Sequence, residues 1–137
     1  IAGFLGNTQI TYLDEIVTKR ERNYHRLAEA IYSLSDRYYP INTSHMDFVS
    51  NFAIPVVCKD KQLLKSLVTR CNGKVEIRTI VGGDMTKQPF FKKHAKEFTR
   101  VLKNSNASLI HDQGLYFGNN PELTDAELDL LEALFTS

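Results

Sequence analysis

EIRTIVGGDMTKQPFF, residues 76–91, is the stretch around which this chain is organised. A short run rich in β-branched residues ends at Gly82-Gly83, and a polar run follows that leads into Gln88-Pro89 and two phenylalanines. Strands that end in glycine and continue as a polar loop are common positions for ligand contacts in α/β proteins. The stretch predicts a strand over Val75–Val81, a loop that contacts a ligand, and then a segment from Pro89 to about Lys103 that contains a short helix.

On the N-terminal side of this stretch, the pattern predicts a long helix, a strand and a second helix. Apolar residues at a spacing of three and four indicate an amphipathic helix from Thr8 to about Leu34, which Tyr38-Tyr39-Pro40 interrupts. Phe48–Cys58 predicts a strand, in which Pro55 favours an edge position or a break between two short strands. Asp60 is expected to cap a helix that ends at Asn72-Gly73 and carries Leu63, Leu64, Leu67 and Val68.

On the C-terminal side, Ala107–Gln113 predicts a helical turn stopped by Gly114, and Leu115–Phe117 predicts a third strand. Thr124, with Glu127 three positions later, has the pattern of a capping box at the start of the last helix. The buried face of that helix is expected to comprise Leu128, Leu131, Leu134 and Phe135. The order of elements predicts one α/β domain over residues 1–137, an α+β-like two-layer unit with a long N-terminal helix and a small sheet of about three strands covered by helices.

Composition restricts the classes of function. The chain has 137 residues, with 17 Lys and Arg against 16 Asp and Glu, so its overall charge favours neither nucleic acid nor an anionic membrane as a partner. Cys58 and Cys71 lack metal-ligand spacing and are interpreted as reduced cytosolic thiols, with a disulfide between them as the minor alternative. The chain has no long apolar run and no signal-peptide pattern. The reduced thiols favour a cytoplasmic protein. The chain begins without methionine and inside an apolar pattern, which favours a piece cut from a longer chain.

Single motifs leave their interpretations open. Arg78 could hold a phosphate or a sugar hydroxyl at the end of its strand, or it could be an arginine paired in solvent on an edge strand. The run Gly82-Gly83-Asp84 lacks the spacing of a phosphate-binding loop and by itself indicates a tight turn. Asp84 and Asp112 could be imagined as paired carboxylates, but nothing in the sequence places them together. The histidines show no metal-binding pattern and are interpreted as surface or packing residues, at His25, His45, His94 and His111.

Three segments taken together carry a family resemblance. They are IAGFLGNTQITYLDEIVTKR at residues 1–20, EIRTIVGGDMTKQPFF at residues 76–91, and GLYFGNNPELTDAELDLL at residues 114–131. In this order and spacing they resemble the DegT/DnrJ/EryC1/StrS family of sugar aminotransferases and dehydratases. The loop form Gly-Gly-Asp-Met-Thr-Lys-Gln-Pro is similar to that of the 3-dehydratases of CDP- and GDP-linked 4-keto-6-deoxyhexoses. Thr79 departs from the usual proline, and Asn119-Asn120 departs from the common histidine.

The resemblance implies the C-terminal small domain of a fold-type I enzyme that uses pyridoxal 5′-phosphate. It implies a substrate that is a nucleotide-linked 4-keto-6-deoxy sugar, used in polysaccharide or O-antigen (lipopolysaccharide) biosynthesis, and a homodimer around the apolar end Ile1–Leu5. The substrate contacts that it implies in this chain are Arg78, Gly83, Asp84, Thr86 and Gln88.

The same resemblance places the catalytic lysine, or the histidine that replaces it in dehydratases, upstream of this chain together with the other main cofactor contacts. We therefore expect no catalytic, cofactor-binding or metal-binding residue here, and an isolated chain that folds but neither binds the cofactor firmly nor turns over. The alternative is a stand-alone α/β interaction module that meets a partner through its first helix.

Overall fold

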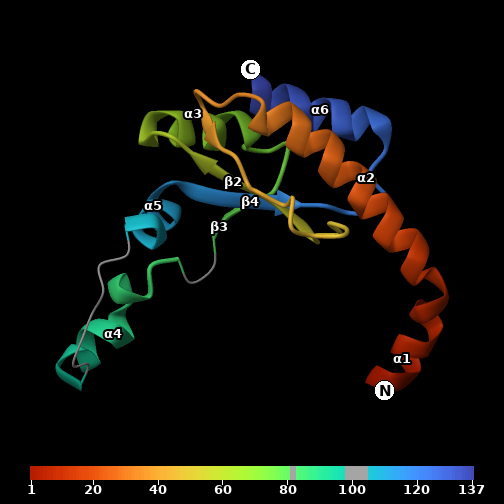
Figure 1. Cartoon of the computed structure of the whole chain (residues 1–137), viewed down its shortest axis with the longest axis horizontal. Helices are drawn as coiled ribbons and strands as arrows, with labels where there is room; N and C mark the ends of the chain where they lie inside the picture. Colours follow the sequence, from red (N-terminus) through yellow and green to blue (C-terminus); the bar gives the residue numbers. More distant parts are fainter. Residues whose placement is uncertain (81–82, 98–104) are drawn as a thin grey trace.

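A computed structural model of the chain describes residues 1–80, 83–97 and 105–137. Their elements follow one another as α1 (Ala2–Gln9), η1 (Ile10–Tyr12), α2 (Leu13–Tyr32), β1 (Tyr38–Tyr39), β2 (Ala53–Cys58), α3 (Lys61–Cys71), β3 (Ile77–Thr79), η2 (Met85–Lys87), α4 (Pro89–His94), η3 (Ala95–Glu97), α5 (Ser105–Gln113), β4 (Gly114–Gly118) and α6 (Asp125–Thr136). Figure 1 shows α2, α3 and α6 gathered on one side of the sheet, while α1 and α4 project on the other side.

The sheet is antiparallel, with the strand order β1-β2-β4-β3. The prediction of a small sheet covered by helices is confirmed, although the number of strands is four among the described residues rather than about three. The additional strand is β1, a two-residue segment that the sequence pattern marked only as a break after the first helix. Its residues pair with Cys58 and Val57 of β2.

Pro55 lies in a strand with neighbours on both sides, so the prediction of an edge position or a break was wrong. The reason is the shortness of β1, which pairs only with residues 57 and 58 and ends before Pro55. The Pro55 carbonyl accepts a hydrogen bond from Tyr32 Oη at 2.6 Å, on the side of β2 that faces away from β4. A strand residue directs its N and O to the same side, so the missing N–H of proline deprives no ladder partner.

The core lies between the sheet and the helices α2, α3 and α6. Alternate residues of β2 and β4 face it, because successive strand residues point to opposite sides. Ile54 pairs with Phe117 and Val56 with Leu115, and all four are buried. The helices contribute the predicted apolar positions of the last helix and those of α2, namely Tyr24, Leu27, Ile31, Leu128, Leu131, Leu134 and Phe135.

Polar contacts join α2 to α6 along the same side. The Arg26 guanidinium binds carboxylates at three positions of α6, with Nε donating to Glu132 at 2.6 Å and the other nitrogens meeting Asp125 and Asp129. The contacts with Glu132 and then Asp129 raise the pKa of Arg26. Thr124 and Glu127 form the predicted capping box at the start of α6. The predicted cap of α3 is also confirmed, since Asp60 accepts from the Leu63 N–H at 2.7 Å.

Asn119 ties three segments together where β4 leaves the sheet. Its side-chain amide donates to the carbonyls of Arg20 and Asn51 at 2.9 Å each, and its backbone N–H donates to Phe52 O at 2.8 Å. The residue is 1% exposed. The asparagine that departs from the family pattern at this position therefore serves the packing of α2 against the loop before β2.

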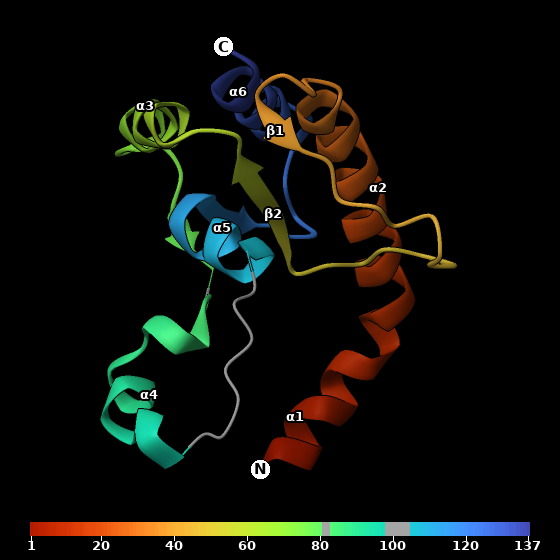
Figure 2. The ribbon, with the colours of Figure 1, turned by 60° about the vertical axis from the view of Figure 1, so that its left-hand side comes forward.

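The first helix begins earlier than predicted, at Ala2, and contains the short 3-10 segment η1 before α2 starts. Ile1 and the residues of α1 and η1 are exposed, among them Phe4, Leu5, Ile10 and Tyr12. The predicted apolar end is thus uncovered. Figure 2 shows this segment extending away from the sheet.

The remaining boundaries differ by a few residues. The strand predicted over Val75–Val81 is β3, Ile77–Thr79, and residue 81 lies outside the described residues. The short helix expected between Pro89 and about Lys103 is α4, which is followed by η3 to Glu97, and the rest of that segment lies outside the described residues.

Both cysteines are buried and free, as expected for reduced thiols. Burial raises the pKa of the Cys58 thiol to about 11. Within the described residues, no helix has the length and apolar character needed to cross a membrane.

Candidate substrate-binding loop

Arg78 lies at the middle of β3, an edge strand of the sheet. Its side chain is exposed, and Nε and Nη2 donate to Glu76 Oε1 at 2.9 and 2.6 Å. This contact is the main reason that the pKa of Arg78 is raised. Arg78 and Pro55 both pair with Tyr116, so the three residues form a row across the sheet on the face away from the core.

The polar loop begins at Gly83 and runs through η2 to Gln88. Asp84 is 8% exposed and caps η2, because its carboxylate accepts from the Thr86 N–H at 3.0 Å and from Thr86 Oγ1 at 2.6 Å. The Thr86 hydroxyl is the main cause of the lowered pKa of Asp84, with the Lys87 charge acting in the same direction. Gln88 ends η2 and precedes Pro89, which is at the first position of α4. The side chains of Asp84 and Thr86 are therefore held by each other within the loop.

Two neighbouring residues of α5 contact the loop. His111 Nδ1 accepts a hydrogen bond from the Asp84 N–H at 3.2 Å. Asp112 accepts from Lys87 Nζ at 2.7 Å and meets Lys61 Nζ at 3.4 Å, and the Lys87 contact is the main cause of its lowered pKa. The Asp84 carboxylate accepts from Thr86, and the Asp112 carboxylate is paired with Lys87 and Lys61, so each carboxylate has its own partners.

The predicted site residues fall into two adjacent groups. Gly83, Asp84, Thr86 and Gln88 lie in one loop, whereas Arg78 precedes it on β3. Arg78 and Thr79 line a cavity of about 220 Å³ together with His111 and Asp112 of α5. The structure thus connects the strand to the loop through α5, which the sequence did not indicate, since the contacting residues are 25 to 27 positions apart.

The outer face of the sheet carries two adjoining hollows of about 370 and 380 Å³. Phe52, Ala53 and Tyr116 contribute to both, Ile80 and Pro55 to one, and Arg78 to the other. Phe52 is 72% exposed. Aromatic rings, apolar surface and a guanidinium beside one another suit an organic ligand with an anionic group.

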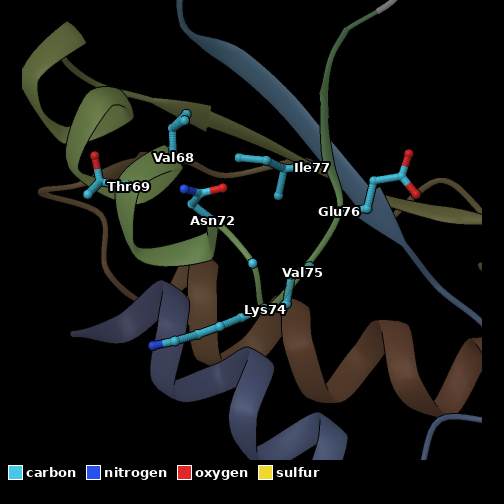
Figure 3. Close-up of a pocket in the computed structure, with 8 residues that line it drawn as sticks. Val68, Thr69, Asn72, Lys74, Val75, Glu76 and Ile77 are labelled. Carbon is cyan, nitrogen blue, oxygen red and sulfur yellow. The ribbon is translucent and has the colours of Figure 1, made fainter.

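A larger hollow of about 640 Å³ lies between the end of α3 and β3, and it does not have the features of a site (Figure 3). Ile77 lies toward Val68 there, while Lys74 and Glu76 point away in different directions. Its polar groups do not converge on a common point, so the hollow lacks the arrangement of polar groups that would orient a ligand.

The acid–base side chains beside the loop, His111 and Asp112, are not arranged to serve pyridoxal 5′-phosphate. The cofactor requires an acid–base group at its imine and an anion at its ring nitrogen. His111 Nδ1 already accepts from a backbone N–H, and the carboxylate of Asp112 is held by Lys87. Among the residues that the structure describes, no group of three or more His, Cys, Asp or Glu residues could hold a metal ion.

The fold is that of the aminotransferase-type enzymes that depend on pyridoxal phosphate. The chain aligns over 95% of its length with Escherichia coli GDP-4-keto-6-deoxy-D-mannose-3-dehydratase with bound hydrated PLP, at a TM-score of 0.74 and 23% identity. A structure of GDP-4-keto-6-deoxymannose-3-dehydratase with a trapped PLP-glutamate geminal diamine matches equally, with a TM-score of 0.74 and 23% identity. In each case the chain covers 33% of the solved chain.

The chain belongs to the DegT/DnrJ/EryC1/StrS aminotransferase family, whose sequence profile matches residues 1–134. A curated relative is dTDP-4-dehydro-2,6-dideoxy-D-glucose 3-dehydratase of Saccharopolyspora spinosa, 26% identical over 127 residues. The alignment covers 91% of this chain and 27% of that protein, so the chain spans about a quarter of the length of this relative. The family resemblance found in the sequence is confirmed.

Proposed function

We propose that this chain is the C-terminal small domain of a pyridoxal- or pyridoxamine-phosphate enzyme that acts on a nucleotide-linked 4-keto-6-deoxy sugar. The names of its relatives support 3-dehydration over transamination. The free, buried thiols suit a reducing compartment such as the cytoplasm. The observation that carries the proposal is the polar loop held beside Arg78 at the edge of the sheet, in a chain of this family.

In this proposal the loop from Gly83 to Gln88 and Arg78 contact the sugar nucleotide. The guanidinium of Arg78 is exposed and has a planar fork of donors that suits phosphate oxygens. Glu76 occupies part of that fork through a solvent-exposed ion pair, a kind of contact that an anionic ligand can displace at low cost. Gln88 carries both a donor and an acceptor, which suits vicinal sugar hydroxyls.

The test uses the full-length enzyme with Arg78→Ala and Gln88→Ala. We expect each variant to lower kcat/KM by at least about tenfold with little change in melting temperature. Lys74→Ala is the matched control, because Lys74 is a cation close to β3 that points away from it (Figure 3). Unchanged kinetics in both variants would mean that the loop is only a structural turn and that Arg78 only forms a surface ion pair.

The cofactor and the acid–base residue would come from the remainder of the enzyme. We therefore expect the isolated chain, mixed with pyridoxal 5′-phosphate, to give no stoichiometric imine band in the visible region. A stable band that persists after removal of the surface lysines would contradict this assignment.

The uncovered residues of α1 and η1 are proposed to pack against a second subunit or the remainder of the enzyme. Ile1, Phe4 and Leu5 lie together with Ile10 and Leu13 in an exposed apolar segment. Light scattering of the full-length enzyme should show a homodimer, which Phe4→Ser with Leu5→Ser weakens. A wild-type enzyme that stays monomeric at high concentration would exclude the dimer.

The stand-alone interaction module is the alternative from another class. The gene separates the two: an open reading frame of roughly 350–400 residues, the size of two or more domains, supports the enzyme. A reading frame that starts close to Ile1 supports the module. The upstream residue at the imine position, lysine or histidine, would separate transamination from dehydration.

A further inference from the structure

We propose that His111 is a positioning residue for the substrate-binding loop and acts as the backbone acceptor that fixes Gly83-Asp84. The proposal rests on the proposed function of the loop. His111 itself is assigned no contact with substrate or cofactor. Its role is to fix the place from which the loop residues reach the sugar nucleotide.

The hydrogen bond defines the form of the histidine. A backbone N–H can only donate, so the Asp84 N–H at 3.2 Å requires an unprotonated Nδ1. The proton of the neutral ring is therefore on Nε2. The Asp84 carboxylate is occupied by Thr86 on the other side of the residue, so the backbone and the side chain of Asp84 are held by two different partners.

Gly83 and His111 are complementary in shape. Gly83 has a φ of +47°, a backbone conformation that residues with a side chain rarely adopt. A β-carbon at this position would collide with Nδ1 of His111 and would lie 3.0 Å from the histidine Cβ. The absence of a side chain at residue 83 is what lets the imidazole lie against the loop and reach the next amide.

His111 lies on a helix that is joined directly to the sheet. The helix α5 passes directly into β4, which pairs with both β2 and β3 inside the sheet. The next residue, Asp112, adds a second connection to the loop through Lys87 at 2.7 Å and reaches α3 through Lys61. Two adjacent side chains, His111 and Asp112, therefore connect the loop to the helix that leads into β4, an inner strand of the sheet.

The experiment compares two substitutions of His111 in the full-length enzyme. Asparagine can place an acceptor oxygen close to the position of Nδ1, whereas leucine has similar bulk and no acceptor. Hydrogen exchange of the amides at residues 83–88 reports how often the loop opens, and kcat/KM reports how well the site serves the substrate. His45→Leu is the control for loss of an exposed histidine elsewhere.

We expect His111→Leu to speed exchange of the Asp84 amide by at least about tenfold and to lower kcat/KM by at least about tenfold. We expect His111→Asn to stay within about threefold of the wild type in both measurements. Global unfolding alone would not produce rescue by asparagine together with exchange limited to this loop.

The outcomes separate this inference from the proposed function. Unchanged exchange of the Asp84 amide in His111→Leu overturns the positioning role, whatever the kinetics show. Faster exchange with unchanged kcat/KM also overturns it, because the loop would then be held by His111 without serving the substrate. Arg78→Ala tests the proposed function independently, since this variant can still lower kcat/KM in either case.

Discussion

The two sides of the sheet differ in how they are stabilised. On the core side, α2, α3 and α6 cover buried strand residues, and Arg26 and Asn119 join segments about 100 residues apart in sequence. On the other side, Phe52 and Arg78 stay exposed, and the loop after β3 depends on contacts with α5. One side therefore accounts for the fold, and the other retains the surface where binding can occur.

The largest difference between the sides should appear in two phenylalanine substitutions. Phe135 is fully buried against Phe117, at a ring distance of 4.4 Å, whereas Phe52 is 72% exposed on the outer face. Phe135→Ala should cost about 3–5 kcal/mol of unfolding free energy, and Phe52→Ala about 0.5 kcal/mol or less, in urea unfolding of the chain. Equal losses would mean that the outer face is also part of the core.

Asn119 tests whether the connection behind the sheet is as important as the apolar core. Asn119→Ala removes two hydrogen bonds to backbone carbonyls and should cost about 1–3 kcal/mol, measured in the same unfolding experiment. Asn120→Ala is the neighbouring control, because its side chain accepts a single hydrogen bond from the described residues, the exposed Glu122 N–H at 3.1 Å. A smaller loss at Asn119 than at Asn120 would contradict the assignment.

The capping box of α6 provides an effect of intermediate size on the core side. Thr124→Ala removes the acceptor for the Glu127 N–H and should cost about 1 kcal/mol, while Thr124→Ser should retain most of the stability. Thermal unfolding of the two variants gives the comparison. Identical melting of Thr124→Ala and the wild type would mean that packing alone fixes the start of the helix.

Lowering the pH should have the smallest effect on stability, and it should act on groups at both sides of the sheet. The pKa values of Asp84, Asp112 and Glu127 are lowered from ordinary values of 3.8, 3.8 and 4.5. These folded-state values lie below those of the unfolded chain, so the stabilisation is complete above pH 4.5 and is lost as pH falls through the lower folded values. Unfolding measured from pH 6 to pH 2 should show a shallower acid loss in Asp112→Asn than in the wild type.

Periodicity and capping residues predicted the core side well. The spacing in α2 and α6 places their apolar residues on one face, and the caps at Asp60 and Thr124 depend on residues only three positions apart. Local signals of this kind can be read from one segment at a time. The position of Pro55 could not, because it depends on the length of a strand formed by residues 38–39.

The candidate site was predicted in part. The polar loop and Arg78 were marked by their own sequence and by the family resemblance, and whether they contact substrate remains a prediction. The contacts of His111 and Asp112 with the loop were missed, because they join residues 25 to 27 positions apart and have no spacing rule. A glycine followed by an aspartate gives no sign of the histidine that will occupy the space beside it.

The two cysteines give the fold a built-in chemical probe. Cys58 and Cys71 are buried, and burial raises the pKa of both thiols, to about 11 at Cys58. A thiol reagent reacts with the thiolate, so modification at neutral pH requires an opening that exposes the sulfur and restores its ordinary acidity. The rate at which the reagent labels the wild-type protein would therefore report how often the core opens, without any substitution or attached dye.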